Sequence, residues 1–115
     1  MSYLGKPINV DNNTQLIAFG PFPEGSRLSK VLFAVINGSA EYRIQIALSD
    51  HVPSSLDSAY KVCPPLTVWH NSAVTEFYEL PIRRVFSTRF RYLVVAIEAT
   101  FTLAGFVWAD VSLKD

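Results

Sequence analysis

Short apolar runs, rich in valine, isoleucine, phenylalanine, tyrosine and tryptophan, alternate with polar turn residues along the chain. These residue types favour β-strands, and no long stretch has a helical period. The pattern therefore predicts an all-β protein. The expected strands are 14–19, 28–36, 42–48, 67–70, 74–82, 89–100 and 106–113.

Strands of this number and length predict a two-sheet antiparallel β-sandwich of about seven or eight strands, with a jelly-roll-like topology. An immunoglobulin-type sandwich is less favoured, because the paired cysteines that mark many of those domains are missing. Residues 1–13 are polar and rich in turn formers, so we expect an N-terminal arm or an edge segment there. The length of 115 residues fits a single domain, 1–115.

The Asn37-Gly38 pair is the clearest local signal. Asparagine and glycine suit the two central positions of a type I′ turn, where both residues have positive φ. The sequence therefore predicts a β-hairpin between strands 28–36 and 42–48. In its register Phe33 is opposite Tyr42 and both point to one face of the sheet.

The run 89–100 is apolar on both alternating faces. Leu93, Val95 and Ile97 share one face, and Phe90, Tyr92, Val94 and Ala96 share the other. We therefore expect a central strand that is covered on both sides. Trp108, in the last expected strand, is predicted to belong to the core.

The composition is unusually poor in charge. Charged residues make up 17% of the chain and hydrophobic residues 50%, whereas ordinary domains carry about 25% charged residues. A short chain with so few charges is expected to cover both faces of its sheets or to bury surface against a partner. The net charge is zero, so no overall attraction to nucleic acid or to an anionic membrane is expected.

Cys63 is the single cysteine, which excludes an internal disulfide. The first residues lack the apolar region of a signal peptide, and no run is long enough to span a membrane. Synthesis in the cytoplasm is therefore the expectation.

No catalytic motif stands out. His51 and Cys63 could form a nucleophilic pair, but a packed turn at Cys63 is favoured. Oxygen ligands for Ca²⁺ could come from an N-terminal cluster, although such residues more often make turns. The cluster consists of Asn9, Asp11, Asn12 and Asn13. We therefore predict no catalytic, cofactor-binding or metal-binding residues.

Four arginines interleave with aromatic residues around one predicted corner of the sandwich. Such a pattern is found in platforms for single-stranded nucleic acid. A solvated corner or an interface is favoured, because the net charge is zero and part of the aromatic set alternates toward the core. The arginines are Arg83, Arg84, Arg89 and Arg91.

Trp69, His70 and Asn71 at a strand end could stack on a saccharide and hydrogen-bond to it. The runs 89–93 and 105–111 also resemble the closing strands of galactose-binding, discoidin-like jelly rolls. That resemblance bears on the fold more than on the function. A carbohydrate-binding jelly-roll module, for example of a phage tail or fibre, is the alternative function.

As a whole the chain resembles, in type and without a shared motif, the small β-sandwich virion structural proteins of tailed phages, in particular capsid decoration or cement proteins. The resemblance implies a non-enzymatic protein that stabilises a virus particle through protein–protein contacts, the major capsid protein among its partners. It also implies a homo-oligomer, with a trimer as the best single expectation, located in the virion.

Contacts with partners are expected from apolar residues outside the strand pattern. The alternative is that these side chains fold back and cap the ends of the sandwich. The expected contact residues are Tyr3, Leu4, Phe22, Val52, Leu56 and Tyr60.

Overall fold

The structure is a computed structural model that describes residues 2–11, 13–37, 40–54, 59–62, 66–70, 76–99 and 102–114. These residues contain β-strands and no helix, so none of them forms a helix that could cross a membrane. The strands are β1 (Ser2–Asp11), β2 (Thr14–Phe19), β3 (Arg27–Asn37), β4 (Ala40–Ser49), β5 (Tyr60–Lys61), β6 (Leu66–His70), β7 (Glu76–Val85), β8 (Tyr92–Ala99) and β9 (Thr102–Ser112).

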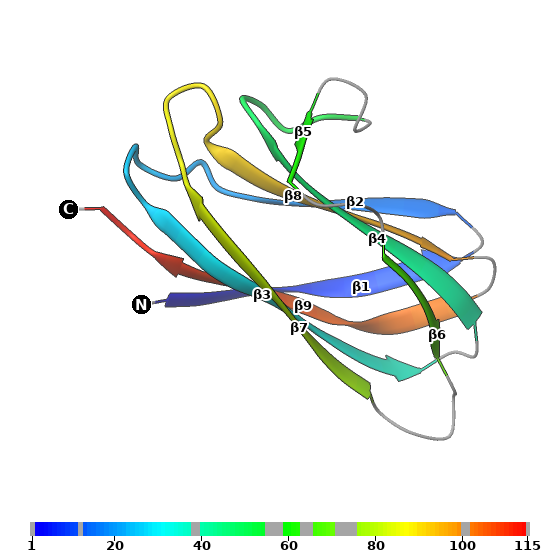
Figure 1. Cartoon of the computed structure of the whole chain (residues 1–115). Coiled ribbons are helices and arrows are strands. Elements are labelled where there is room, and N and C mark those ends of the chain that lie inside the picture. Colours follow the sequence, from blue (N-terminus) through cyan, green and yellow to red (C-terminus); the bar gives the residue numbers. More distant parts are fainter. Residues whose placement is uncertain are drawn as a thin grey trace.

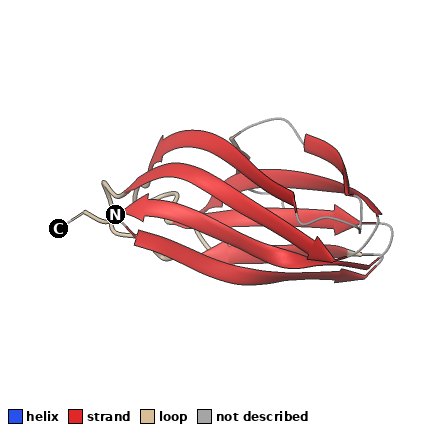
Figure 2. Cartoon of the chain, turned by 90° about the horizontal axis from the view of Figure 1, so that it is seen from below, coloured by secondary structure: helices blue, strands red, loops and turns tan. Residues whose placement is uncertain are grey.

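The strands form two antiparallel sheets that pack face to face (Figures 1 and 2). Sheet A has the order β1-β9-β3-β7. Sheet B has the order β2-β8-β4, and both β5 and β6 pair with the free side of β4. The predicted two-sheet antiparallel sandwich is confirmed.

The strand order is that of a jelly roll. β1 pairs with β9, β2 with β8, and β3 with β7, while β5 and β6 together pair with β4. The chain is thus one long antiparallel ribbon that turns back after β4. The ribbon is wrapped so that β1, β2, β3 and β4 alternate between the two sheets. Residues 1–13 contribute β1, an edge strand of sheet A.

The predicted hairpin at Asn37-Gly38 is wrong. β3 pairs with β7 and β9 in sheet A, whereas β4 pairs with strands of sheet B, so β3 and β4 are not neighbours. Gly38 itself lies outside the described residues. The alternation was read correctly: Phe33 and Tyr42 are both buried, but they approach the core from opposite sheets. A period of two fixes which side chains share a face and does not fix which strand lies alongside.

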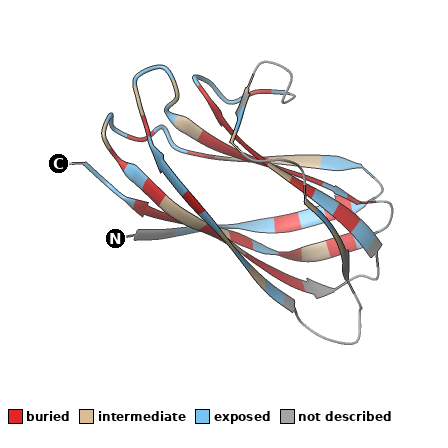
Figure 3. Ribbon diagram, viewed as in Figure 1, coloured by how far each residue is buried: buried red, intermediate tan, exposed pale blue. Residues whose placement is uncertain are grey.

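The core fills the space between the sheets, where inward-facing residues alternate with outward-facing ones (Figure 3). The ring of Tyr42 on sheet B meets that of Tyr78 on sheet A edge to face, with the centroids 6.5 Å apart. The largest fully buried side chains include Tyr42, Phe33, Phe86, Leu28, Ile44, Ile46, Leu93 and Ile97.

β8 is the central strand that its two apolar faces predict. It lies between β2 and β4, and Leu93, Val95 and Ile97 point into the core. Val94 and Ala96 on its other face are also buried.

Backbone hydrogen bonds close the end of the sandwich where both termini lie (Figure 2). The N–H of Gly25 donates to the carbonyl of Phe86, and that of Phe86 donates to the carbonyl of Ser26. Gly25 has a φ of 91°, which favours glycine. The ring of Phe22 packs on that of Phe86 at 4.5 Å, so the 20–26 and 86–91 connections form one unit.

Two phenylalanines of sheet A give a matched test of this fold. Phe33→Ala should lower the free energy of unfolding by about 3–5 kcal/mol, because it leaves a cavity in the core. Phe77→Ala should change it by less than about 0.5 kcal/mol, since Phe77 is 75% exposed. Urea unfolding measures both values, and equal costs would contradict the assignment of inner and outer faces.

Candidate protein-protein interface

The outer face of sheet A carries a row of apolar residues that crosses all four strands. Pro7 is opposite Phe106, Phe106 is opposite Ala34, and Ala34 is opposite Phe77. The neighbours of Phe106 along β9, Gly105 and Val107, are buried, so Phe106 points away from the core. Alternation and register together therefore put these four residues on the outside.

A second row runs beside the first. Gly5 is opposite Trp108, and Trp108 is opposite Leu32. The rings of Phe106 and Trp108 stack with centroids 5.8 Å apart and planes 22° apart. The prediction that Trp108 belongs to the core is wrong: it lies half-buried on the outer face. Both rows form what we call the outer apolar face: Pro7, Leu32, Ala34, Phe77, Phe106 and Trp108.

Gly5 makes room for the indole ring of Trp108. A Cβ atom at Gly5 would lie 2.6 Å from both Cδ1 and Nε1 of that ring. No ordinary side chain fits at this distance, so glycine lets Trp108 lie over β1. Gly5 therefore allows Trp108 to take its place in the outer apolar face, and the sequence pattern alone did not single this glycine out.

The exposure of this face is uneven. Phe77 is 75% exposed and Phe106 is 42% exposed, while Ala34 between them is buried. Single exposed apolar residues are normal, but adjoining ones typically mark an interaction site. At its border Lys30 and Glu79 form an ion pair of 3.3 Å.

The buried carboxylate of Asp110 lies on the same side of sheet A as Trp108. It is 2% exposed, and its Oδ1 atom has no hydrogen-bond partner among the described residues. In the register Asp110 is opposite Lys30. A buried oxygen without a donor is costly.

The expected contact residues are dispersed. Leu4 is 39% exposed on β1, and Val52 is 61% exposed in the segment after β4. Phe22 is 4% exposed and packs against Phe86. Its ring caps the end of the sandwich, which was the alternative reading.

The structure describes less of the remaining residues that were expected to contact a partner or a sugar. Tyr3, Tyr60, Trp69 and His70 lie in strands β1, β5 and β6, and only their backbone is described. Leu56 and Asn71 lie outside the described residues.

The candidate catalytic and metal residues resolve into local contacts. The Nδ1 atom of His51 contacts the carboxylate of Asp50, and this hydrogen bond lowers the pKa of Asp50 below its ordinary value. Cys63 lies outside the described residues. The N–H of Asp11 donates to Oδ1 of Asn13 at 3.2 Å, as in a side-chain-stabilised turn. Among the described residues no three histidine, cysteine or acidic side chains gather into a metal site.

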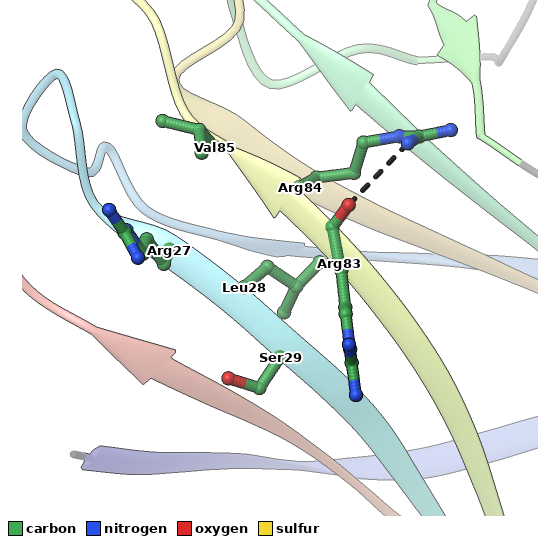
Figure 4. Close-up of a pocket in the computed structure, with 6 residues that line it drawn as sticks. All are labelled: Arg27, Leu28, Ser29, Arg83, Arg84 and Val85. Atoms are coloured by element: carbon green, nitrogen blue, oxygen red, sulfur yellow. Dashed lines mark hydrogen bonds between the residues drawn. The ribbon is translucent and has the colours of Figure 1, made fainter.

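A pocket of about 470 Å³ opens where β3 begins and β7 ends. Arginines line it together with Leu28, Ser29 and Val85. The guanidinium groups of Arg27, Arg83 and Arg84 point in different directions (Figure 4), so they do not converge on one small ligand. The pocket therefore presents positive charge that is spread over its surface.

Replacing Gly5 tests how Trp108 is held. Gly5→Val should push the indole off β1, expose it, and lower the free energy of unfolding by about 1–3 kcal/mol. Trp69→Phe provides a background with one tryptophan, in which the emission maximum should shift to longer wavelength. An unchanged spectrum would contradict the packing of Trp108 over Gly5.

The comparisons with known proteins are sparse. No protein-family profile and no curated protein sequence matches the chain. Among solved structures the chain is similar to the coat protein of tobacco streak virus, with a TM-score of 0.44 and 12% identity over 96% of this chain and 88% of that one. At this TM-score and identity the likeness carries no argument about function.

Proposed function

We propose that the protein is a non-enzymatic structural component of a virus particle, of the capsid decoration or cement type. It would stabilise the assembly through protein–protein contacts, as a homo-oligomer, with a trimer as the best single expectation, and against capsid subunits. The proposed location is the virion, after synthesis in the host cytoplasm.

The outer apolar face is the single observation that supports this proposal most. A sheet face that meets water normally alternates with polar outward residues. Here Phe77, Phe106 and Trp108 take outward positions on two strands. An assembly would bury these rings, which gives the outward aromatic residues a role.

The free energy of association determines how much of the outer apolar face a contact must bury. Burying one phenylalanine side chain contributes about 1.5–3 kcal/mol, whereas association costs about 4–15 kcal/mol in lost freedom. Phe77 and Phe106 together contribute about 3–6 kcal/mol, which at most reaches the lower end of that cost. Contact over both rows, with Leu32 and Trp108 included, is needed.

The fold by itself does not choose between functions. Jelly rolls occur in viral capsid proteins and also in lectins, so the topology is compatible with both functions predicted from the sequence. Function has to come from the surface that each protein builds on the fold.

Carbohydrate binding is the second candidate, and one observation favours it. The rings of Phe106 and Trp108 stack on the outer face of sheet A, with their centroids 5.8 Å apart. Aromatic rings at a surface can stack on the apolar face of a sugar. This platform differs from the sequence-based candidate at Trp69, His70 and Asn71.

A double substitution on the outer apolar face tests the structural role. Phe77→Ser with Phe106→Ser should convert the oligomer to a monomer in sedimentation velocity at about 0.5 M salt, where contacts between exposed charges are screened, with little change in urea unfolding. Val85→Ser is the matched control, because Val85 is 58% exposed and lies outside this face. The control should assemble like the wild type.

Two other results would contradict the proposed structural role. A wild-type protein that stays monomeric and does not bind purified particles would overturn the proposal. Binding to one class of sugar on a glycan array, lost in Trp108→Ala, would select the carbohydrate-binding alternative instead.

A further inference from the structure

The sandwich has two chemically different ends along its longest dimension of 43 Å. One end, which we call the termini end, holds both termini, the start of β3, the end of β7, and the connections 20–26 and 86–91 (Figure 1). The opposite end, which we call the far end, holds the end of β1 and the starts of β2, β4, β7 and β9. Antiparallel pairing puts these chain positions together, although they are far apart in sequence.

Most of the cationic side chains lie at the termini end. Among the described residues the acids at this end are Glu24, Asp50 and the buried Asp110, and Asp50 already contacts His51. The cations at this end are Arg27, Arg83, Arg84, Arg89, Arg91 and Lys114.

The far end has the opposite character. Its one cation among the described residues is Arg43, which is opposite Glu98 in the register. The acids at this end with described side chains are Asp11, Glu41 and Glu98.

Neither set is fully neutralised within the molecule, although the His51 hydrogen bond and, in addition, Arg89 lower the pKa of Asp50. Among the described residues no ion pair involves the six cations of the termini end, and the guanidinium of Arg89 lies 5.6 Å from the centre of the Phe90 ring. At the far end the acids accept hydroxyl hydrogen bonds, from Thr102 to Asp11 at 3.2 Å and from Thr14 to Glu98 at 3.4 Å. These bonds leave the carboxylate charges in place.

The zero net charge therefore hides a polarised molecule. At physiological ionic strength charges are screened beyond about 8 Å, and the long axis measures 43 Å. The two ends of one molecule consequently do not attract each other. Each end can be neutralised only by a charged surface that comes into contact with it.

We propose that the termini end of one molecule binds the far end of a second copy, head to tail. Charge complementarity favours this occupant, because the chain carries both a cationic and an acidic end. The diverging guanidinium groups in Figure 4 suit a broad acidic surface better than one small anion. A contact between two different surfaces is heterologous and repeats, closing into a ring or growing into a filament.

This contact is independent of the outer apolar face, which lies on the broad side of sheet A. The salt dependence of association distinguishes the two contacts. Screening weakens contacts between exposed charges, whereas it does not weaken the burial of apolar surface. Each contact can therefore fail without the other.

Sedimentation velocity at low and high salt tests the proposal. Raising the ionic strength from about 0.02 M to about 0.5 M shortens the screening length from roughly 21 Å to roughly 4 Å, so head-to-tail association should weaken by at least about tenfold. The experiment uses the Phe77→Ser, Phe106→Ser protein, so that the apolar contact does not contribute.

Charge reversal then identifies the two ends. The basic-end variant R83E/R84E and the acidic-end variant E41K/E98K should each fail to associate alone at low salt. Mixed in equal amounts they should associate again, because a reversed basic end then meets a reversed acidic end. Glu79→Lys, in the middle of β7, is the control for a change in net charge and should associate normally.

Three results would overturn the proposal. The first is association that does not depend on salt. The second is a mixture of the two variants that stays monomeric. The third is tight binding of inorganic polyphosphate by a protein that remains monomeric without it, which would assign the termini end to an anionic polymer.

Discussion

The inner faces of the two sheets bury one another, and the rest of the structure depends on that contact. Phe33 and Val35 from sheet A and Ile44 and Ile46 from sheet B contribute to one continuous core. Neither sheet could leave this surface in water, because burial of apolar area is the dominant favourable contribution to folding. Wrapping the chain as a ribbon brings β3 and β4 to opposite sides of the core.

The same wrapping decides what remains on the outside. Because β1, β9, β3 and β7 alternate inward and outward residues in register, the outward residues of distant segments line up in rows. Pro7, Phe106 and Phe77 come together in this way from three parts of the sequence. Within this row Phe77 and Phe106 keep exposed surface, which is available to another molecule.

The same arrangement of strands also separates positive from negative residues. The core excludes charged groups, and the outer face of sheet A takes few, so most of the remaining charges gather where strands begin and end. Arg83 and Arg84 come at the end of β7, and Glu41 comes near the start of β4. An antiparallel sheet puts such positions at opposite ends, which polarises a neutral chain along its length.

The sequence by itself determined the strands, their alternation and the two-sheet architecture, because a period of two is a local property that neighbouring residues carry. It also indicated the buried central strand around Val95. Only the tertiary structure decided that Phe22 is buried, that Trp108 lies outside, and that Asn37 leads to the other sheet. These outcomes depend on which strands lie side by side. Gly5 and Trp108, for example, are opposite each other in neighbouring strands, although nearly the whole chain separates them in sequence. The pairing of strands is determined by the burial of all sheet faces together, so a local sequence pattern does not specify it.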